Sequence, residues 1–134
     1  MSTRLNMVGL FVNDLQKMVA FYRDVLGFAI DWDGKGPYAE FSNEGVRFSM
    51  YERKLLPDIL KKTPSFPVGI NGTFELALDY STSTEVDQEF SRMVANGAVP
   101  VYEPRNEPWG MRSSMITDPE GNLIEIGSWN IVTE

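Results

Sequence analysis

An internal repeat is the feature that most constrains the fold of this chain of 134 residues. Each half has the pattern of a strand, an amphipathic helix that ends at a glycine, and then three short strands separated by turns. Both halves also carry Glu-Gly before their last strand, at Glu44-Gly45 and Glu120-Gly121. Repetition of elements in a fixed order is a stronger signal than local propensity. The sequence therefore predicts an α+β fold of two βαβββ modules.

The first half begins with an apolar strand over residues 6–12, NMVGLFV. Asn13 or Asp14 can cap the helix that follows. That helix has apolar side chains at the spacing of one buried face, namely Leu15, Met18, Val19, Tyr22, Val25 and Leu26. Gly27 ends the helix, and the segments FAIDW, YAEFS and VRFSMY are expected to form short strands.

The second half restarts with a strand over residues 73–79, TFELALD. Thr82 and Glu85 have the spacing of a capping box at the start of a second helix. Its apolar positions are Val86, Phe90, Met93 and Val94, and the strands VPVY, MRSSMIT and NLIEIGSW follow. We expect one domain over residues 1–134, with modules at 1–52 and 72–134. Residues 53–71, rich in proline and basic side chains, are expected to be a linker with a short helical turn at 58–62.

Composition excludes several kinds of chemistry. The chain has no histidine and no cysteine, so Ser-His-Asp triads, histidine metal ligands, thiol catalysis and disulfides are all ruled out. The formal net charge of -7 argues against binding to nucleic acid or to anionic membranes. The sequence has no apolar run long enough to span a bilayer and no signal-peptide pattern at its start, which fits a cytoplasmic protein.

Three segments, NMVGLFVNDLQKMVAFYRDVLGF, EPRNEPWGMRS and DPEGNLIEIGSW, resemble the vicinal oxygen chelate superfamily. That superfamily includes glyoxalase I, the bleomycin-resistance proteins, fosfomycin-resistance enzymes and extradiol dioxygenases. The resemblance covers nearly the whole chain. It implies two βαβββ modules whose curled mixed sheets form a cup, with the helices on the outer face. Relatives of this length usually pair, so a homodimer is expected, swapped or side by side, with Trp129 and residues 130–134 as candidate interface residues.

The resemblance also identifies the positions at which metal-dependent relatives hold a divalent ion. They correspond here to Met7, Ser49, Glu75 and Glu125, with Thr73 as the alternative to Glu75 if the register shifts by two. Methionine is a poor ligand for hard divalent ions and serine is a weak one. We therefore expect no metal cofactor, although two carboxylates with several waters could hold Mg²⁺ or Mn²⁺.

Glu125 lies in the middle of an apolar strand, where a charged side chain is costly to bury without a partner. Strand alternation places Arg47 and Tyr51 on the inward face, and Trp109 lies beside Pro108 and Gly110 in a loop. The predicted ligand-binding residues are Glu125, Glu75, Trp109, Tyr51, Arg47, Met7, Ser49 and Arg112. For Arg112, a salt bridge to a nearby glutamate is the alternative. No catalytic residue is assigned, and Glu125 is the candidate if there is one.

These observations favour a bleomycin-resistance-like protein that binds a small organic molecule in the cup without a metal. The alternative is a divalent-metal-dependent lyase or isomerase of the glyoxalase I type, so whether the protein is an enzyme stays open. A third possibility is a module that binds a peptide or a partner protein, and no residue supports it specifically. The expected partners are a small-molecule ligand and a second copy of the chain.

Overall fold

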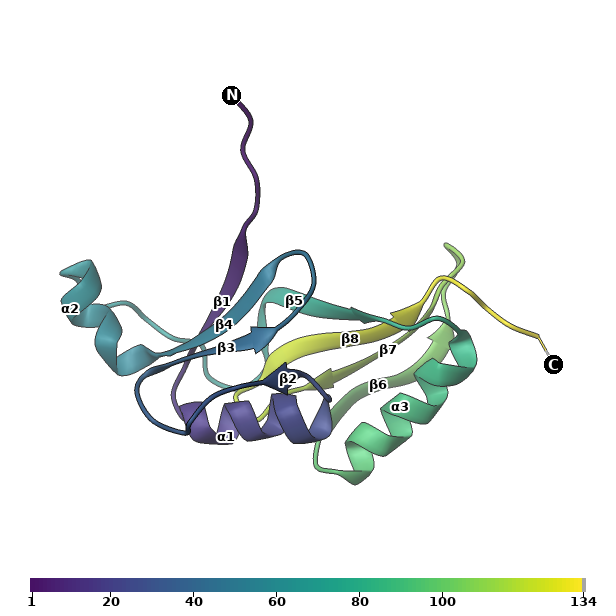
Figure 1. Cartoon of the computed structure of the whole chain (residues 1–134). Coiled ribbons are helices and arrows are strands. Elements are labelled where there is room, and N and C mark those ends of the chain that lie inside the picture. Colours follow the sequence, from purple (N-terminus) through teal and green to yellow (C-terminus); the bar gives the residue numbers. More distant parts are fainter. Residues whose placement is uncertain (134) are drawn as a thin grey trace. The chain divides into compact units, whose positions relative to one another are not determined.

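The computed structural model describes residues 1–133 of the chain. The chain divides into two compact units, Met1–Phe66 and Pro67–Glu134, which we call the first and the second unit. Each unit contains a four-stranded mixed sheet and a helix that packs on one face of that sheet (Figure 1). The α+β class and the repeated βαβββ order predicted from the sequence are confirmed.

The first unit has the sheet order β1-β4-β3-β2, in which β1 runs parallel to β4 and the other pairs are antiparallel. Asp14 caps the first helix, because its side chain accepts a hydrogen bond of 3.1 Å from the backbone N–H of Lys17. The elements are β1 (Met7–Val12), α1 (Leu15–Ala20), the π-helical turn η1 (Phe21–Val25), β2 (Ala29–Ile30), β3 (Tyr38–Ser42) and β4 (Arg47–Glu52).

Aromatic packing forms the core of the first unit, on the face that α1 covers. Tyr22 is fully buried, and its ring centroid lies within 6.1 Å of the centroids of four phenylalanine rings, those of Phe21, Phe28, Phe41 and Phe48. Alternation along β1 buries Leu10 and leaves Phe11 exposed. The opposite face of the sheet therefore carries Phe11 and the other side chains that alternation directs away from α1.

The second unit repeats this topology with the sheet order β5-β8-β7-β6. Thr82 caps its helix as predicted, accepting a hydrogen bond of 3.3 Å from the backbone N–H of Glu85. Val86, Phe90 and Met93 of the helix are buried, as are Ile116, Ile124 and Ile126 of the sheet that it covers. The elements are β5 (Asn71–Asp79), α3 (Ser83–Ala95), β6 (Val99–Asn106), β7 (Arg112–Thr117) and β8 (Asn122–Ser128).

The predicted linker contains more helix than the expected turn at 58–62. A 3-10 turn, η2 (Arg53–Leu55), leads into α2 (Leu56–Leu60), and the helix ends at Lys61 in a left-handed conformation. Pro57 at the start of α2 fits the helix, and Leu56 is buried. Within residues 1–133, no helix is long and apolar enough to cross a membrane.

Candidate functional site

Glu125 lies on β8, on the sheet face of the second unit opposite α3. Its neighbours across the sheet are Ala77 of β5 and Met115 of β7. Glu75 pairs with Leu123 one step along the same face, so alternation places both carboxylates on it. Glu125 is half-buried and Glu75 is exposed. The structure therefore brings together, on one face, the two carboxylates that the sequence singled out.

Burial raises the pKa of Glu125 above the ordinary value of a glutamate, and the negative charges of Glu75 and Glu107 raise it further. Both causes disfavour the ionised form. A ligand that supplies hydrogen-bond donors or positive charge would remove this penalty. Glu125 is thus a carboxyl group whose environment favours either a proton or a donor group.

Glu107 completes this acidic cluster, and the sequence analysis did not identify it. Its Oε1 accepts hydrogen bonds from Arg105 Nε at 2.6 Å and from the Ser113 hydroxyl at 2.9 Å. These bonds lower the pKa of Glu107, with Arg105 the largest cause. The hydroxyls of Tyr102 and Ser113 lie 3.1 Å apart. The neighbouring carboxyls Glu107 and Glu125 therefore have pKa values displaced in opposite directions.

The turn between β6 and β7 is held in place at both ends. The backbone N–H of Glu107 donates to the carbonyl of Met111 at 2.7 Å, and that of Gly110 donates to the carbonyl of Glu107 at 3.1 Å. The side chain of Glu107 is only 8% exposed, so its bonds to Arg105 and Ser113 anchor the turn to both strands. Trp109 sits in this turn with 61% of its surface exposed.

Met111 connects the turn to Glu125. A Cβ atom on Gly127 would lie 2.6 Å from Met111 Cε and 3.6 Å from Glu125 Oε1. Met111 is buried, so it fills the space above Gly127 beside the carboxyl group. We infer that Met111 contributes to the burial that raises the pKa of Glu125. The alternation of β8, which puts Gly127 on the same face as Glu125, is the sequence signal for this contact.

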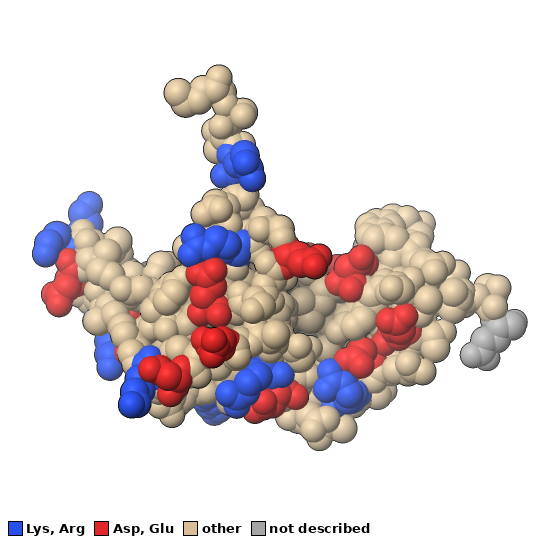
Figure 2. All heavy atoms as spheres, viewed as in Figure 1, with Lys and Arg blue, Asp and Glu red and all other residues tan. Residues whose placement is uncertain are grey.

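Arg112 belongs to the other face of the sheet. Its Nε donates to Asp87 Oδ1 of α3 at 2.7 Å, and its Nη1 donates to Asn106 Oδ1 at 3.0 Å. The structure therefore gives Arg112 a salt bridge, as the alternative to ligand contact expected, but the partner is an aspartate and not a glutamate. In the view of Figure 2, acidic and basic side chains are likewise interspersed rather than gathered into a patch of one sign.

In the first unit, Arg47 and Tyr51 lie on one face of the sheet with two residues that the sequence analysis missed. Arg47 forms two hydrogen bonds to Glu40, at 2.6 and 3.0 Å, and these, followed by the hydrogen bond from Tyr38, lower the pKa of Glu40 to about 2. Tyr38 donates to Glu40 at 2.6 Å, and its ring packs edge-on against Tyr51 at 5.7 Å. The period of two in YAEFS would have placed Tyr38 and Glu40 on this face.

Met7 and Ser49 satisfy each other in the first unit, since the Ser49 hydroxyl donates to Met7 Sδ at 3.3 Å. A thioether and a hydroxyl are poor ligands for the hard divalent ions that two carboxylates attract. Across residues 1–133, no group of three or more His, Cys, Asp or Glu side chains could hold a metal ion. Two of the four positions that the resemblance assigns to metal ligands, Met7 and Ser49, therefore carry side chains that bind hard divalent ions weakly.

The sequence profile of the Glyoxalase/Bleomycin resistance protein/Dioxygenase superfamily matches residues 4–126. The uncharacterized protein YraH of Bacillus subtilis is 28% identical over 125 residues, which cover 92% of this chain and 96% of that protein.

Solved structures share the fold. A glyoxalase/bleomycin resistance protein/dioxygenase from Nocardioides has a TM-score of 0.81 at 23% identity. The matched region covers 97% of this chain and 85% of the Nocardioides chain. A lactoylglutathione lyase from Agrobacterium tumefaciens has a TM-score of 0.72 at 21% identity. The matched region covers 95% of this chain and 94% of the lyase chain. At these identities the likeness shows the fold alone.

Proposed function

This chain belongs to the Glyoxalase/Bleomycin resistance protein/Dioxygenase superfamily, and from that membership we propose that it binds a small organic molecule without a resident metal. The binding surface is the sheet face that carries Glu125. The proposed ligand-binding residues in the second unit are Glu125, Glu75 and Trp109, and we add Glu107 and Met111 because they lie near Glu125. Arg47, Tyr51, Met7 and Ser49 stay in the proposed set as the residues of the first unit.

The observation that carries this proposal is the half-buried carboxyl group of Glu125 beside two further carboxyls. Carboxylates that are buried to this extent and serve only the fold usually pair with an arginine or a lysine, as Glu107 pairs with Arg105. The charges that act on Glu125 are those of Glu75 and Glu107, and both are negative. A ligand with an amine or amide donor would relieve that repulsion and gain a charge-assisted hydrogen bond.

The turn that holds Trp109 supports the same proposal. A tryptophan that is 61% exposed leaves a large apolar surface in contact with water. The bonds of Glu107 fix the backbone of this turn before any ligand arrives, so less conformational entropy is lost on binding. We propose that Trp109 covers the apolar part of the ligand while Glu125 binds its donor group.

The experiment that tests the function is a thermal-shift screen with cationic, amide-rich and thiol-conjugate compounds. A compound that binds the native state raises the melting temperature in proportion to its affinity and concentration. Each hit is then titrated against Glu125→Gln, Glu75→Gln and the control Glu103→Gln, which removes an exposed charge from β6. Hits that bind Glu125→Gln and Glu75→Gln as tightly as wild type would show that these carboxylates do not serve the site.

The first prediction concerns metals. Addition of Mg²⁺, Mn²⁺, Ni²⁺ or Zn²⁺ is expected to raise the melting temperature little, because the paired Met7 and Ser49 offer poor ligands. Differential scanning fluorimetry with and without each ion measures the change. A rise of several degrees with one ion that disappears in Glu125→Gln would contradict the prediction.

One observation favours a second function, a metal-dependent lyase or isomerase of the glyoxalase I type. Glu125 stands where the family resemblance places a metal-binding glutamate. Metal analysis of protein purified without chelators separates the two functions. One divalent ion per chain would favour the lyase and rule out the metal-free proposal.

The second prediction is a homodimer. The apolar side chains of Trp129, Ile131 and Val132 are exposed at the end of the second unit, and exposed apolar surface of this kind favours association. Light scattering at micromolar concentration is expected to give twice the mass of one chain, and Trp129→Ser is expected to weaken the dimer. A monomer mass for the wild type would contradict this.

We also propose a cytoplasmic location for the protein.

A further inference from the structure

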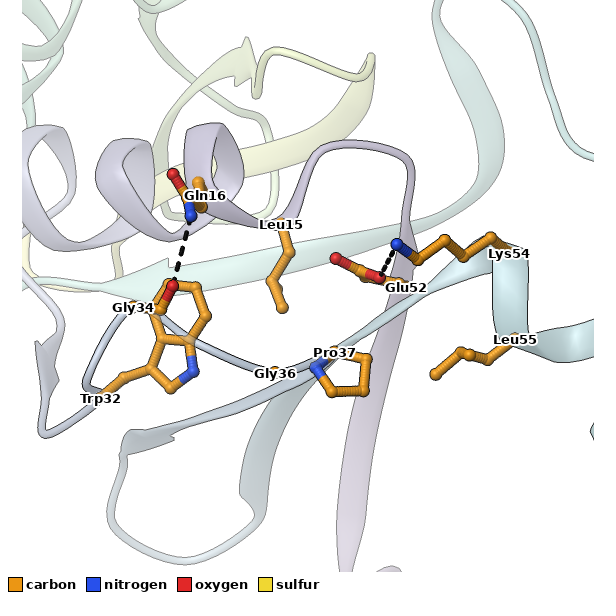
Figure 3. Close-up of a pocket in the computed structure, with 9 residues that line it drawn as sticks. All are labelled: Leu15, Gln16, Trp32, Gly34, Gly36, Pro37, Glu52, Lys54 and Leu55. Atoms are coloured by element: carbon orange, nitrogen blue, oxygen red, sulfur yellow. Dashed lines mark hydrogen bonds and ion pairs between the residues drawn. The ribbon is translucent and has the colours of Figure 1, made fainter.

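A hollow of about 400 Å³ lies in the first unit, away from the residues proposed above (Figure 3). Its apolar walls are Leu15, Trp32, Pro37 and Leu55, and Glu52 and Lys54 lie at one side. Glu52 follows Tyr51 on β4, and alternation puts the two side chains on opposite faces of the sheet. The hollow is therefore on the face that α1 covers, and none of its lining residues belongs to the predicted site.

The wall that contains Trp32 is fixed by hydrogen bonds. The indole N–H of Trp32 donates to the carbonyl of Lys35 at 2.9 Å. The side chain of Gln16 donates from α1 to the carbonyl of Gly34 at 3.2 Å, the bond drawn in Figure 3. Asp33 Oδ1 accepts from the backbone N–H of Lys35 at 2.9 Å. The loop of residues 32–35 is thus hydrogen-bonded to α1, and the flat indole ring of Trp32 faces the hollow without rearrangement.

The polar side of the hollow is an ion pair, with Lys54 Nζ 3.0 Å from Glu52 Oε2. The Lys54 side chain is 75% exposed and that of Glu52 is 22% exposed. An ion pair at such a surface position contributes little to stability, so a ligand can replace it at little cost. Once separated, the two side chains offer one cation and one anion next to apolar walls.

We propose that this hollow binds a small amphoteric molecule with a flat apolar body, such as an aromatic amino acid. Its carboxylate meets Lys54, its ammonium group meets Glu52, and its ring lies between Trp32 and Leu15. The volume matches the lower part of the range found for small-molecule sites. This site does not depend on the function proposed for Glu125, because its residues lie in the first unit on the face covered by α1.

The test uses a Trp109→Phe, Trp129→Phe variant, which leaves Trp32 as the single tryptophan of the chain. Both replaced side chains are more than half exposed, so the fold is expected to survive. Trp32 fluorescence is followed during titration with three probes, L-phenylalanine, phenylacetate and phenethylamine, which share a ring and differ in charge. L-phenylalanine is expected to bind about threefold to fivefold more tightly than either of the others, since each exposed charge contact contributes up to about 1 kcal/mol.

Variants of the ion pair test the charge assignment. Lys54→Met is expected to remove the advantage of L-phenylalanine over phenethylamine, and Glu52→Gln its advantage over phenylacetate. Lys62→Met, an exposed lysine outside the hollow, is the matched control, and Glu125→Gln is expected to leave all three dissociation constants unchanged. Equal affinity for the three probes, no response of Trp32 to any of them, or loss of L-phenylalanine binding in Glu125→Gln would overturn the proposal.

Discussion

Replacing Glu125 by glutamine is expected to weaken binding of the screened ligand by about tenfold to a hundredfold. A charge-assisted hydrogen bond contributes roughly 1.5–3 kcal/mol, and glutamine keeps the size of the side chain while removing its charge. Titration calorimetry on wild type and variant gives the ratio of dissociation constants. The control Glu103→Gln removes the same charge from an exposed position on β6 and is expected to change the constant little.

The same variant has an expected effect on stability whose sign follows from the raised pKa of Glu125. A carboxyl whose pKa is higher in the folded state stabilises the fold below its unfolded pKa, and that contribution is lost as pH rises through the folded value. At neutral pH, Glu125→Gln should therefore be at least as stable as wild type, and this advantage should shrink as pH falls through the raised pKa of Glu125 and be absent below the usual pKa of a glutamate. Urea unfolding across this pH range measures it, and a variant less stable at every pH would contradict the assignment.

Replacing Gly121 by alanine is expected to destabilise the fold by about 2–5 kcal/mol, through a left-handed backbone and a steric overlap. Gly121 has a φ of 86°, and a Cβ atom there would overlap the backbone carbonyl oxygen of Gly69. Backbone cannot rotate out of the way as a flexible side chain can. Chemical unfolding of the variant measures the change in the free energy of unfolding.

The repeat supplies a matched control in Gly45, which has the equivalent place before the last strand of the first unit. Its φ is 82°, but a Cβ atom there would meet nothing within 4 Å. Gly45→Ala is therefore expected to cost only the backbone strain, about 1–2 kcal/mol. Equal losses in the two variants would show that the contact with Gly69 does not contribute.

Local patterns in the sequence were sufficient to predict much of the fold. The caps at Asp14 and Thr82 follow from side chains that bond the free N–H groups of a first helical turn, which is a short-range effect. The face of Glu125 follows from the period of two along β8, where Ile124 and Ile126 had to face the core. The repeat then fixed the order of the elements without any information on tertiary contacts.

The acidic cluster around Glu107 depends on contacts that no local pattern specifies. The pairing of β6 with β7 shifts register on both sides of Tyr102, and these shifts decide which side chains of the two strands meet. The Arg105–Glu107 and Glu107–Ser113 bonds depend on how the chain turns between the strands. For a related reason, the salt bridge of Arg112 could be given only as an alternative to ligand contact, since its partner Asp87 lies on α3, distant in sequence.

The most direct test of a metal-free ligand site at Glu125 is mass spectrometry of small molecules released when the protein, purified without chelators or added ligand, is denatured. We expect an organic compound with an amine or amide group in the wild type, strongly reduced in Glu125→Gln and retained in Glu103→Gln. We also expect no stoichiometric divalent ion in the same samples. A compound present equally in wild type and Glu125→Gln, or one divalent ion per chain, would contradict the claim that Glu125 binds a ligand without a metal.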